Sequence, residues 1–112
     1  MKHHLAALAL CATLTCGGCH QATEPAWLID QETMVGFLTE AHLMESYYYL
    51  KTDFRYDSVR PLANATYDTL FQQHGITREA FDSSLAYYSR HDEQLLAIYQ
   101  EVDKNLEALF SK

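Results

Sequence analysis

Two side chains with the types and spacing for metal chemistry occur in the first third of the chain. His42 and Glu45 are three residues apart, so they share one face of a helix and each has a metal-binding atom. Metal-binding helical bundles use Glu-x-x-His on two helices together with two further glutamates, whereas here the order is reversed and no second copy exists. We therefore expect this pair to hydrogen-bond at the surface or between helices, and we predict no metal and no other cofactor.

Hydrolysis is the second chemistry that the residue types suggest. Ser83 and Ser84 have Asp82 and His91 nearby in the sequence, and these are the types of a nucleophile and its base. The Gly-x-Ser-x-Gly turn of serine hydrolases is missing from the sequence, and a serine within a short helix has no oxyanion hole beside it. We predict that the protein is not an enzyme.

The thiol of Cys19 is the third reactive group, and its setting predicts covalent attachment of lipid. Met1-Lys2-His3-His4 leads into an apolar run that ends at Leu14, and Cys16-Gly17-Gly18-Cys19 follows. A basic start, an apolar stretch of roughly 7–15 residues and small residues before a cysteine are typical of a bacterial lipoprotein signal. We predict that residues 1–18 are a cleaved signal peptide and that Cys19 carries palmitate or a similar acyl chain. The alternatives are a plain secretory leader, cut nearby, with Cys19 free or paired, and a cytoplasmic chain with an apolar N-terminus.

Charge and cysteine content limit the partners. The formal net charge is −7, so nucleic acid is a poor partner and an anionic lipid surface repels the domain. Membrane attachment must then depend on the lipid at Cys19.

Cys11 and Cys16 leave with the signal peptide, so no internal disulfide can form. We expect the protein in the cell envelope, anchored by lipid in the outer membrane and facing the periplasm.

Consecutive tyrosines are the most unusual local composition of the chain. Neighbouring side chains on a helix point in different directions, so the rings of Tyr47-Tyr48-Tyr49 and of Tyr87-Tyr88 cannot all enter one core. Tyr48 and Tyr88 fall on apolar seams, whereas Tyr47, Tyr49 and Tyr87 are expected to be partly exposed. Because tyrosine is enriched at protein interfaces, we predict these three residues as partner-binding. The alternative is that their rings cover the ends of a thin core.

Four stretches with helical periodicity position these residues. The first runs from the N-cap Asp30 to about Lys51, and the second ends at His74-Gly75. Thr77 caps the short third stretch, and Asp92 is expected to cap the fourth. The stripe expected to be buried in the first stretch consists of Met34, Phe37, Leu38, Ala41, Met44 and Tyr48.

No window shows the two-residue alternation of a strand. We predict an all-α fold, a small antiparallel bundle of about four helices that follows the cleaved signal peptide. Residues 19–26 form a polar tether that contains Pro25, and residues 27–112 form the helical domain.

Four stretches of sequence occur in a characteristic order: Phe37–Glu45 (FLTEAHLME), Tyr67–Phe71 (YDTLF), His74–Tyr88 (HGITREAFDSSLAYY) and Leu95–Val102 (LLAIYQEV). Together they resemble a family of small Bacteroidota lipoproteins, domain of unknown function 4296. The resemblance implies an envelope lipoprotein of Gram-negative type. It implies no catalytic residues.

These observations predict a membrane-anchored envelope lipoprotein that acts as a non-enzymatic accessory or adaptor subunit for another envelope protein. A role as an accessory component of outer-membrane protein assembly is the alternative within the same class. An enzyme that binds a small ligand or metal through His42, Glu45 and the tyrosines is the alternative from a different class.

Overall fold

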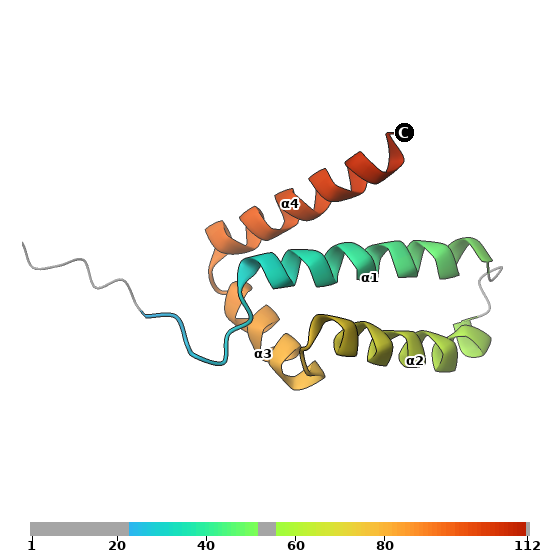
Figure 1. Ribbon diagram of the computed structural model, residues 1–112, viewed down its shortest axis with the longest axis horizontal. Helices are drawn as coiled ribbons and strands as arrows, with labels where there is room; N and C mark the ends of the chain where they lie inside the picture. The colour runs from blue at the N-terminus through green and yellow to red at the C-terminus, as the bar shows by residue number, and fades with distance from the viewer. Residues whose placement is uncertain (1–22, 52–55, 112) are drawn as a thin grey trace, which may run out of the picture.

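The computed structural model describes residues 23–51 and 56–111, and the ordered elements in these ranges are helices (Figure 1). They are α1 (Gln31–Lys51), α2 (Tyr56–His74), α3 (Arg78–Tyr88) and α4 (Asp92–Phe110). Because these ranges contain no strand, the predicted all-α fold is confirmed. The predicted signal peptide and Cys19 lie outside the described residues. None of the helices in the described part of the chain has the length and apolarity needed to cross a membrane.

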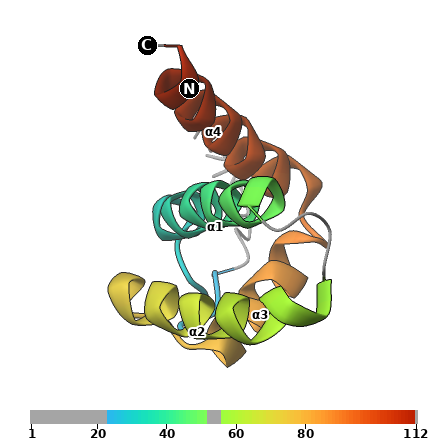
Figure 2. The ribbon, with the colours of Figure 1, turned by 90° about the vertical axis from the view of Figure 1, so that its right-hand side faces the viewer.

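The three long helices are arranged around α1. Figure 1 shows that α2 runs back along α1 in the opposite direction, as predicted, and that α4 lies on the other side of α1. Viewed along its axis in Figure 2, α1 lies between α4 and α2. The short α3 crosses from the end of α2 to the start of α4. The chain thus begins α4 near the start of α1, and the two helices run in the same direction (Figure 1). The two helices diverge toward their C-terminal ends (Figure 1).

Local capping chemistry explains where three of the helices begin or end. Asp30 Oδ1 accepts the main-chain N–H of Thr33 at 2.9 Å, which confirms Asp30 as the N-cap of α1. Thr77 Oγ1 accepts the N–H of Ala80 at 3.1 Å, which confirms the predicted cap of α3. Gly75 ends α2 with a φ of 64°, in the left-handed region where glycine has no Cβ penalty.

The start of α4 differs from the prediction. Asp92 is the first helical residue, and the N-cap position belongs to His91, which makes no side-chain capping bond. The imidazole of His91 is used elsewhere, because its Nδ1 lies 2.7 Å from the main-chain oxygen of Tyr87. Asp92 still contributes a negative charge to the first turn, which the helix dipole favours.

Two buried clusters share α1. The first lies between α1, α3 and α4, and the second lies between α1 and α2. The members of the first cluster are Ile29, Met34, Leu38, Tyr88, Ile98 and Val102. The members of the second cluster are Phe37, Ala41, Leu70 and Phe71. Ile76 and Phe81 pack against both clusters and so join them.

The predicted stripe of α1 is buried only along its first half. The side chains from Met34 to Ala41 on this stripe are buried, whereas Met44 and Tyr48 are half-buried. They lie toward the end of α1 where α4 has diverged from it (Figure 1), so less protein is available to cover them.

The segment before α1 is fastened to α3 through Ile29. Its main-chain N–H donates to Ser84 Oγ at 3.0 Å, and its carbonyl oxygen accepts the hydroxyl of Tyr88 at 2.7 Å. Both α3 side chains are fully buried, so these polar groups satisfy one another away from water. Trp27 adds an edge-on contact with the ring of Tyr87, with centroids 6.3 Å apart.

Candidate functional site

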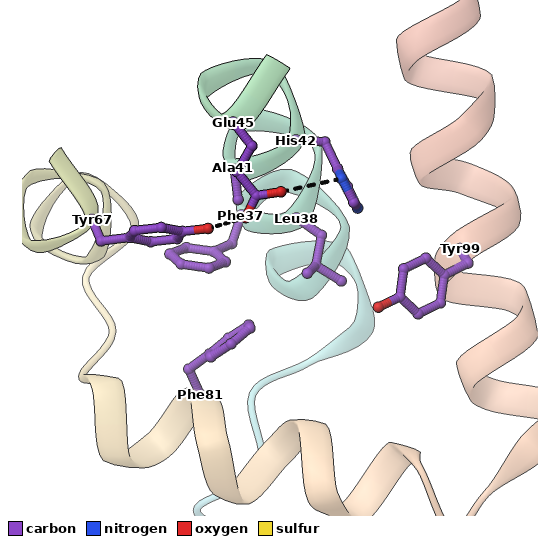
Figure 3. Close-up of a pocket in the computed structure, with 8 residues that line it drawn as sticks. All are labelled: Phe37, Leu38, Ala41, His42, Glu45, Tyr67, Phe81 and Tyr99. Carbon is purple, nitrogen blue, oxygen red and sulfur yellow. Dashed lines mark hydrogen bonds and ion pairs between the residues drawn. The ribbon is translucent and has the colours of Figure 1, made fainter. Parts of the chain in front are cut away.

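A cavity of about 250 Å³ opens beside α1 and is lined by side chains from all four helices described (Figure 3). Tyr67 of α2, Phe81 of α3 and Tyr99 of α4 contribute one ring each. The α1 residues that line the cavity are Phe37, Leu38, Ala41, His42 and Glu45. In Figure 3 the tyrosines stand on opposite sides of α1, with Phe81 facing Phe37 between them.

Packed aromatic rings make the floor of the cavity apolar. The Phe37 side chain is only 1% exposed, and its ring stacks on Phe71 with centroids 4.8 Å apart. Phe81 lies 4.7 Å from the same ring in a tilted arrangement. Such aromatic pairs add about 0.5–1.5 kcal/mol each beyond the apolar area that they bury. The floor is therefore defined by packed rings rather than by adaptable side chains.

The polar edge of the cavity is centred on Glu45. The hydroxyl of Tyr67 donates a hydrogen bond to Oε1 of Glu45. Nδ1 of His42 lies 3.8 Å from the other carboxylate oxygen, which is too long for a hydrogen bond. Burial raises the pKa of the Tyr67 phenol well above its ordinary value, and the hydrogen bond and negative charge of Glu45 raise it further. The phenol therefore stays protonated and holds the carboxylate in place.

The structure places the other chemically capable residues in packing contacts. Ser84 is fully buried and bonded to the main chain of Ile29, which leaves its hydroxyl away from solvent. The His91 ring stacks on Tyr87 with centroids 4.0 Å apart. Across residues 23–51 and 56–111, no group of three or more His, Cys, Asp or Glu side chains is placed to hold a metal ion.

Two of the predicted partner-binding tyrosines are exposed at the C-terminal end of α1, on different sides of the helix because they are two residues apart. The exposed fractions are 58% for Tyr47, 63% for Tyr49 and 82% for the adjacent Leu50. The ring of Tyr48 meets that of Tyr47 edge-on, with centroids 5.7 Å apart, and its hydroxyl shares a 2.7 Å hydrogen bond with the hydroxyl of Thr66. Glu45, Ser46, Tyr49 and Leu50 line a shallow hollow at this end, so Glu45 belongs to both the hollow and the cavity.

Tyr87 is not part of this group. Its contact with Trp27 places it beside the start of α1, and its side chain is half-buried. Because α1 has 21 residues, its ends are about 30 Å apart at 1.5 Å per residue. The three predicted tyrosines therefore occupy two separate regions. We use the name "tyrosine patch" for Tyr47, Tyr49 and Leu50.

The sequence did not single out the rings that form the cavity. Helical spacing puts Tyr99 on the apolar seam of α4 and Phe81 on the seam of α3, yet Tyr99 is 37% exposed. A tyrosine among the apolar residues of a seam indicates a position at the edge of the core, because its hydroxyl needs water or a hydrogen-bond partner. Which helix it faces depends on how the helices cross, and periodicity alone does not give that.

The family model described as a domain of unknown function, DUF4296, matches residues 25–111. This range covers α1 to α4 and includes every residue of the cavity and of the tyrosine patch. Comparison with curated proteins and with solved structures gives no match.

Proposed function

The chain belongs to the family described as domain of unknown function DUF4296, and from that premise we propose that it is a lipid-anchored envelope lipoprotein serving as a non-enzymatic accessory subunit for another envelope protein. The observation that carries this proposal is the tyrosine patch. Leu50 lies one helical turn beyond Tyr47 and lines the same hollow as Tyr49, and exposed apolar groups that gather in this way are typical of protein interaction sites. Tyrosine suits such a site because its ring can be buried against a partner while its hydroxyl stays hydrated.

The leader sequence supports the lipid anchor. Gly17-Gly18-Cys19 follows an apolar stretch and fits the cleavage and lipidation pattern of bacterial lipoproteins. Acyl chains alone give reversible binding when single and stable anchoring when two or more are present. We propose that Cys19 carries such chains and that the domain faces the periplasm from the outer membrane.

The position of the tyrosine patch is compatible with this anchor. The chain enters the domain at the start of α1, where Ile29 is held by Ser84. The tyrosine patch is at the other end of the same helix, about 30 Å away. A lipid-anchored domain would thus present the patch at a distance from its attachment point, where the periplasmic part of a partner is accessible.

Affinity capture from detergent-solubilised membranes tests the docking role. We expect the full-length chain to retain a partner in stoichiometric amount and the double variant Tyr47→Ser/Tyr49→Ser to lose it, with no fall in melting temperature. A matched control is Leu109→Ser/Phe110→Ser, since these side chains are 54% and 72% exposed on α4, outside the tyrosine patch. Equal retention by both double variants would refute docking through the tyrosine patch.

Fractionation tests the anchor separately. The Cys19→Ser variant should leave the membrane fraction, and intact mass measurement of the wild-type chain should show acyl chains on the N-terminal cysteine. A variant that still sediments with membranes after its leader is removed would contradict lipid anchoring, whatever the capture experiment gives.

A further inference from the structure

We propose that the cavity beside α1 is a binding site for an organic cation, and that the cation is the guanidinium or ammonium group of an Arg or Lys side chain from the partner. The inference rests on the proposed function only for the source of the cation. The site itself is argued from its size, its rings and its charge.

The size of the cavity matches one side chain. Sites for drug-sized ligands measure roughly 300–1,000 Å³, and the cavity measures about 250 Å³. Phe37 is only 1% exposed and is covered by its neighbours, so a group that enters meets the other side chains that line the cavity. An extended basic side chain has an apolar stem that suits such walls and a charged end that needs a counter-charge.

The carboxylate of Glu45 supplies that counter-charge, and the aromatic rings add attraction for a cation. Aromatic faces attract a cation that lies within about 6 Å of the ring centroid, and the attraction increases when water is excluded. Tyr67, Phe81 and Tyr99 line the cavity from three helices, with the two tyrosines on opposite sides of α1 and Phe81 facing Phe37 (Figure 3). Glu45 stands at the edge with its carboxylate held by Tyr67. The described residues that line the cavity include no Lys or Arg, and the basic group beside this carboxylate is His42, whose Nδ1 lies 3.8 Å from Oε2.

The same aromatic cluster already holds a guanidinium on α3. Cζ of Arg78 lies 5.0 Å from the centroid of Phe71, and its Nη2 lies 3.5 Å from Oδ1 of Asp68. Phe71 in turn stacks on Phe37, the floor of the cavity. The combination of one ring and one carboxylate therefore accommodates a basic side chain within this fold, and the cavity repeats that combination with more rings.

The tyrosine patch and the cavity are continuous through Glu45. This residue lines the shallow hollow beside Tyr49 and also the edge of the cavity. A partner that covers the tyrosine patch can therefore reach the cavity with a single side chain. The acidic net charge of −7 favours the approach of a basic partner segment.

Titration with small probes tests the site without the partner. The probes are the N-acetyl, C-methylamide derivatives of arginine, lysine and citrulline, the last being a neutral analogue of arginine of nearly the same shape. We expect the two cationic probes to shift amide resonances around the cavity of the full-length chain, with Kd in the range of about 1–10 mM that a single side chain supports. Citrulline should give no saturable shift.

Variants assign the binding to the cavity. Glu45→Gln and Tyr99→Leu should each weaken binding of the arginine probe about tenfold, while Glu101→Gln on α4 should leave it unchanged, because Glu101 pairs with Lys104 outside the cavity. Equal binding of citrulline and arginine, or unchanged binding in Glu45→Gln, would overturn the cation site. These outcomes do not depend on whether a partner exists, so they separate failure of the site from failure of the docking role.

Capture of the partner tests the source of the cation. If an Arg or Lys of the partner occupies the cavity, Glu45→Gln lowers the amount of partner retained from solubilised membranes, and excess arginine probe elutes it. If Glu45→Gln abolishes probe binding while the wild-type amount of partner is retained, the cation is a free small molecule and the assignment to a partner side chain is wrong.

Discussion

The imidazole of His74 lies over Gly36, so that a Cβ at position 36 would stand 3.4 Å from Cε1 of the ring. The same imidazole places Nε2 at 3.0 Å from Oε2 of Glu40 and meets the ring of Phe37 edge-on, with centroids 5.7 Å apart. The last residue of α2 is thus held against the first half of α1.

Substitution of the two glycines by alanine should change stability in opposite directions. Gly36→Ala adds a methyl group at ordinary contact distance from His74 and removes the entropic penalty of a helical glycine, so we expect a gain of up to about 1 kcal/mol. Gly75→Ala forces a Cβ into the left-handed region at φ +64° and should cost about 1–2 kcal/mol, although its surroundings are open. Urea denaturation of both variants measures the difference. A gain for Gly75→Ala would show that the observed turn is not the one that ends α2.

Removal of the buried hydroxyls that hold Ile29 should destabilise the domain. Tyr88→Phe leaves the Ile29 carbonyl without its 2.7 Å donor, and Ser84→Ala leaves the Ile29 N–H without its acceptor. Each change should cost about 1–3 kcal/mol, because a buried polar group then lacks a partner. Chemical denaturation of the two single variants and of the double variant gives the coupling free energy between Ser84 and Tyr88. Tyr99→Phe is the control, since that tyrosine is at the surface, and a cost equal to that of Tyr88→Phe would contradict the role of this bond.

The N-cap of α1 should make stability depend on pH in the acid range. The hydrogen bonds that Asp30 accepts from Thr33 hold the pKa of its carboxyl below the ordinary value of 3.8. The unfolded chain therefore takes up this proton first, and the contribution of Asp30 is present above pH 3.8 and is lost as pH falls through the folded pKa.

Asp30→Asn keeps a capping oxygen but removes the charge. At neutral pH the variant should be less stable than the wild type by about 0.3–1 kcal/mol, the usual size of a charge effect at a helix N-terminus. The difference should vanish once the wild-type carboxyl is protonated. Thermal unfolding of both chains from pH 7 to pH 2.5 measures it, and a constant difference across that range would contradict the mechanism.

Buried phenols should make stability depend on pH in the alkaline range. Burial raises the pKa of Tyr88 to about 12, and the charges of Glu24 and Asp30 act in the same direction. An unfolded tyrosine ionises near its ordinary pKa of 10.0, so the unfolded chain loses the proton first. The contribution of Tyr88 is therefore complete below pH 10.0 and is lost as pH rises toward about 12.

Phenolate absorbance and denaturation measure this effect together. Tyr88→Phe should remove one late-ionising group from the spectrophotometric titration of the folded chain. Above pH 10.0 the unfolding free energy of the variant should decrease less steeply with pH than that of the wild type. The variant is less stable than the wild type at the start of this range. Identical slopes in the two chains would contradict the assignment.

The sequence was sufficient for features that depend on neighbouring residues. The caps at Asp30 and Thr77 and the end of α2 at Gly75 follow from local chemistry, and the structure confirms all three. The cap at Asp92 was wrong because Ser, Thr, Asp and Asn are favoured caps in general, whereas His91 occupies the position through its bond to Tyr87.

The site depends on long-range geometry, which the sequence predicts less well. The exposure of Tyr47 and Tyr49 follows from helical period and is observed. The cavity brings together Glu45, Tyr67 and Tyr99 from three helices, and their meeting depends on the crossing of α4 over α1. The apolar seam indicates which side of each helix is buried but leaves the crossing angle open, so spacing alone does not show that Tyr99 lies at the edge of a cavity.

The two bonds on Ile29 also determine how the domain responds to a pull from its N-terminal side. A tensile load that enters at Thr23 reaches Ile29 before it reaches the capped first turn of α1, and there it is shared by Ser84 within α3 and by Tyr88, the last residue of α3. The force then passes into the core rather than unwinding α1 from its end. A protein tethered at that terminus can be dragged by its anchor while the far end of α1 keeps its shape.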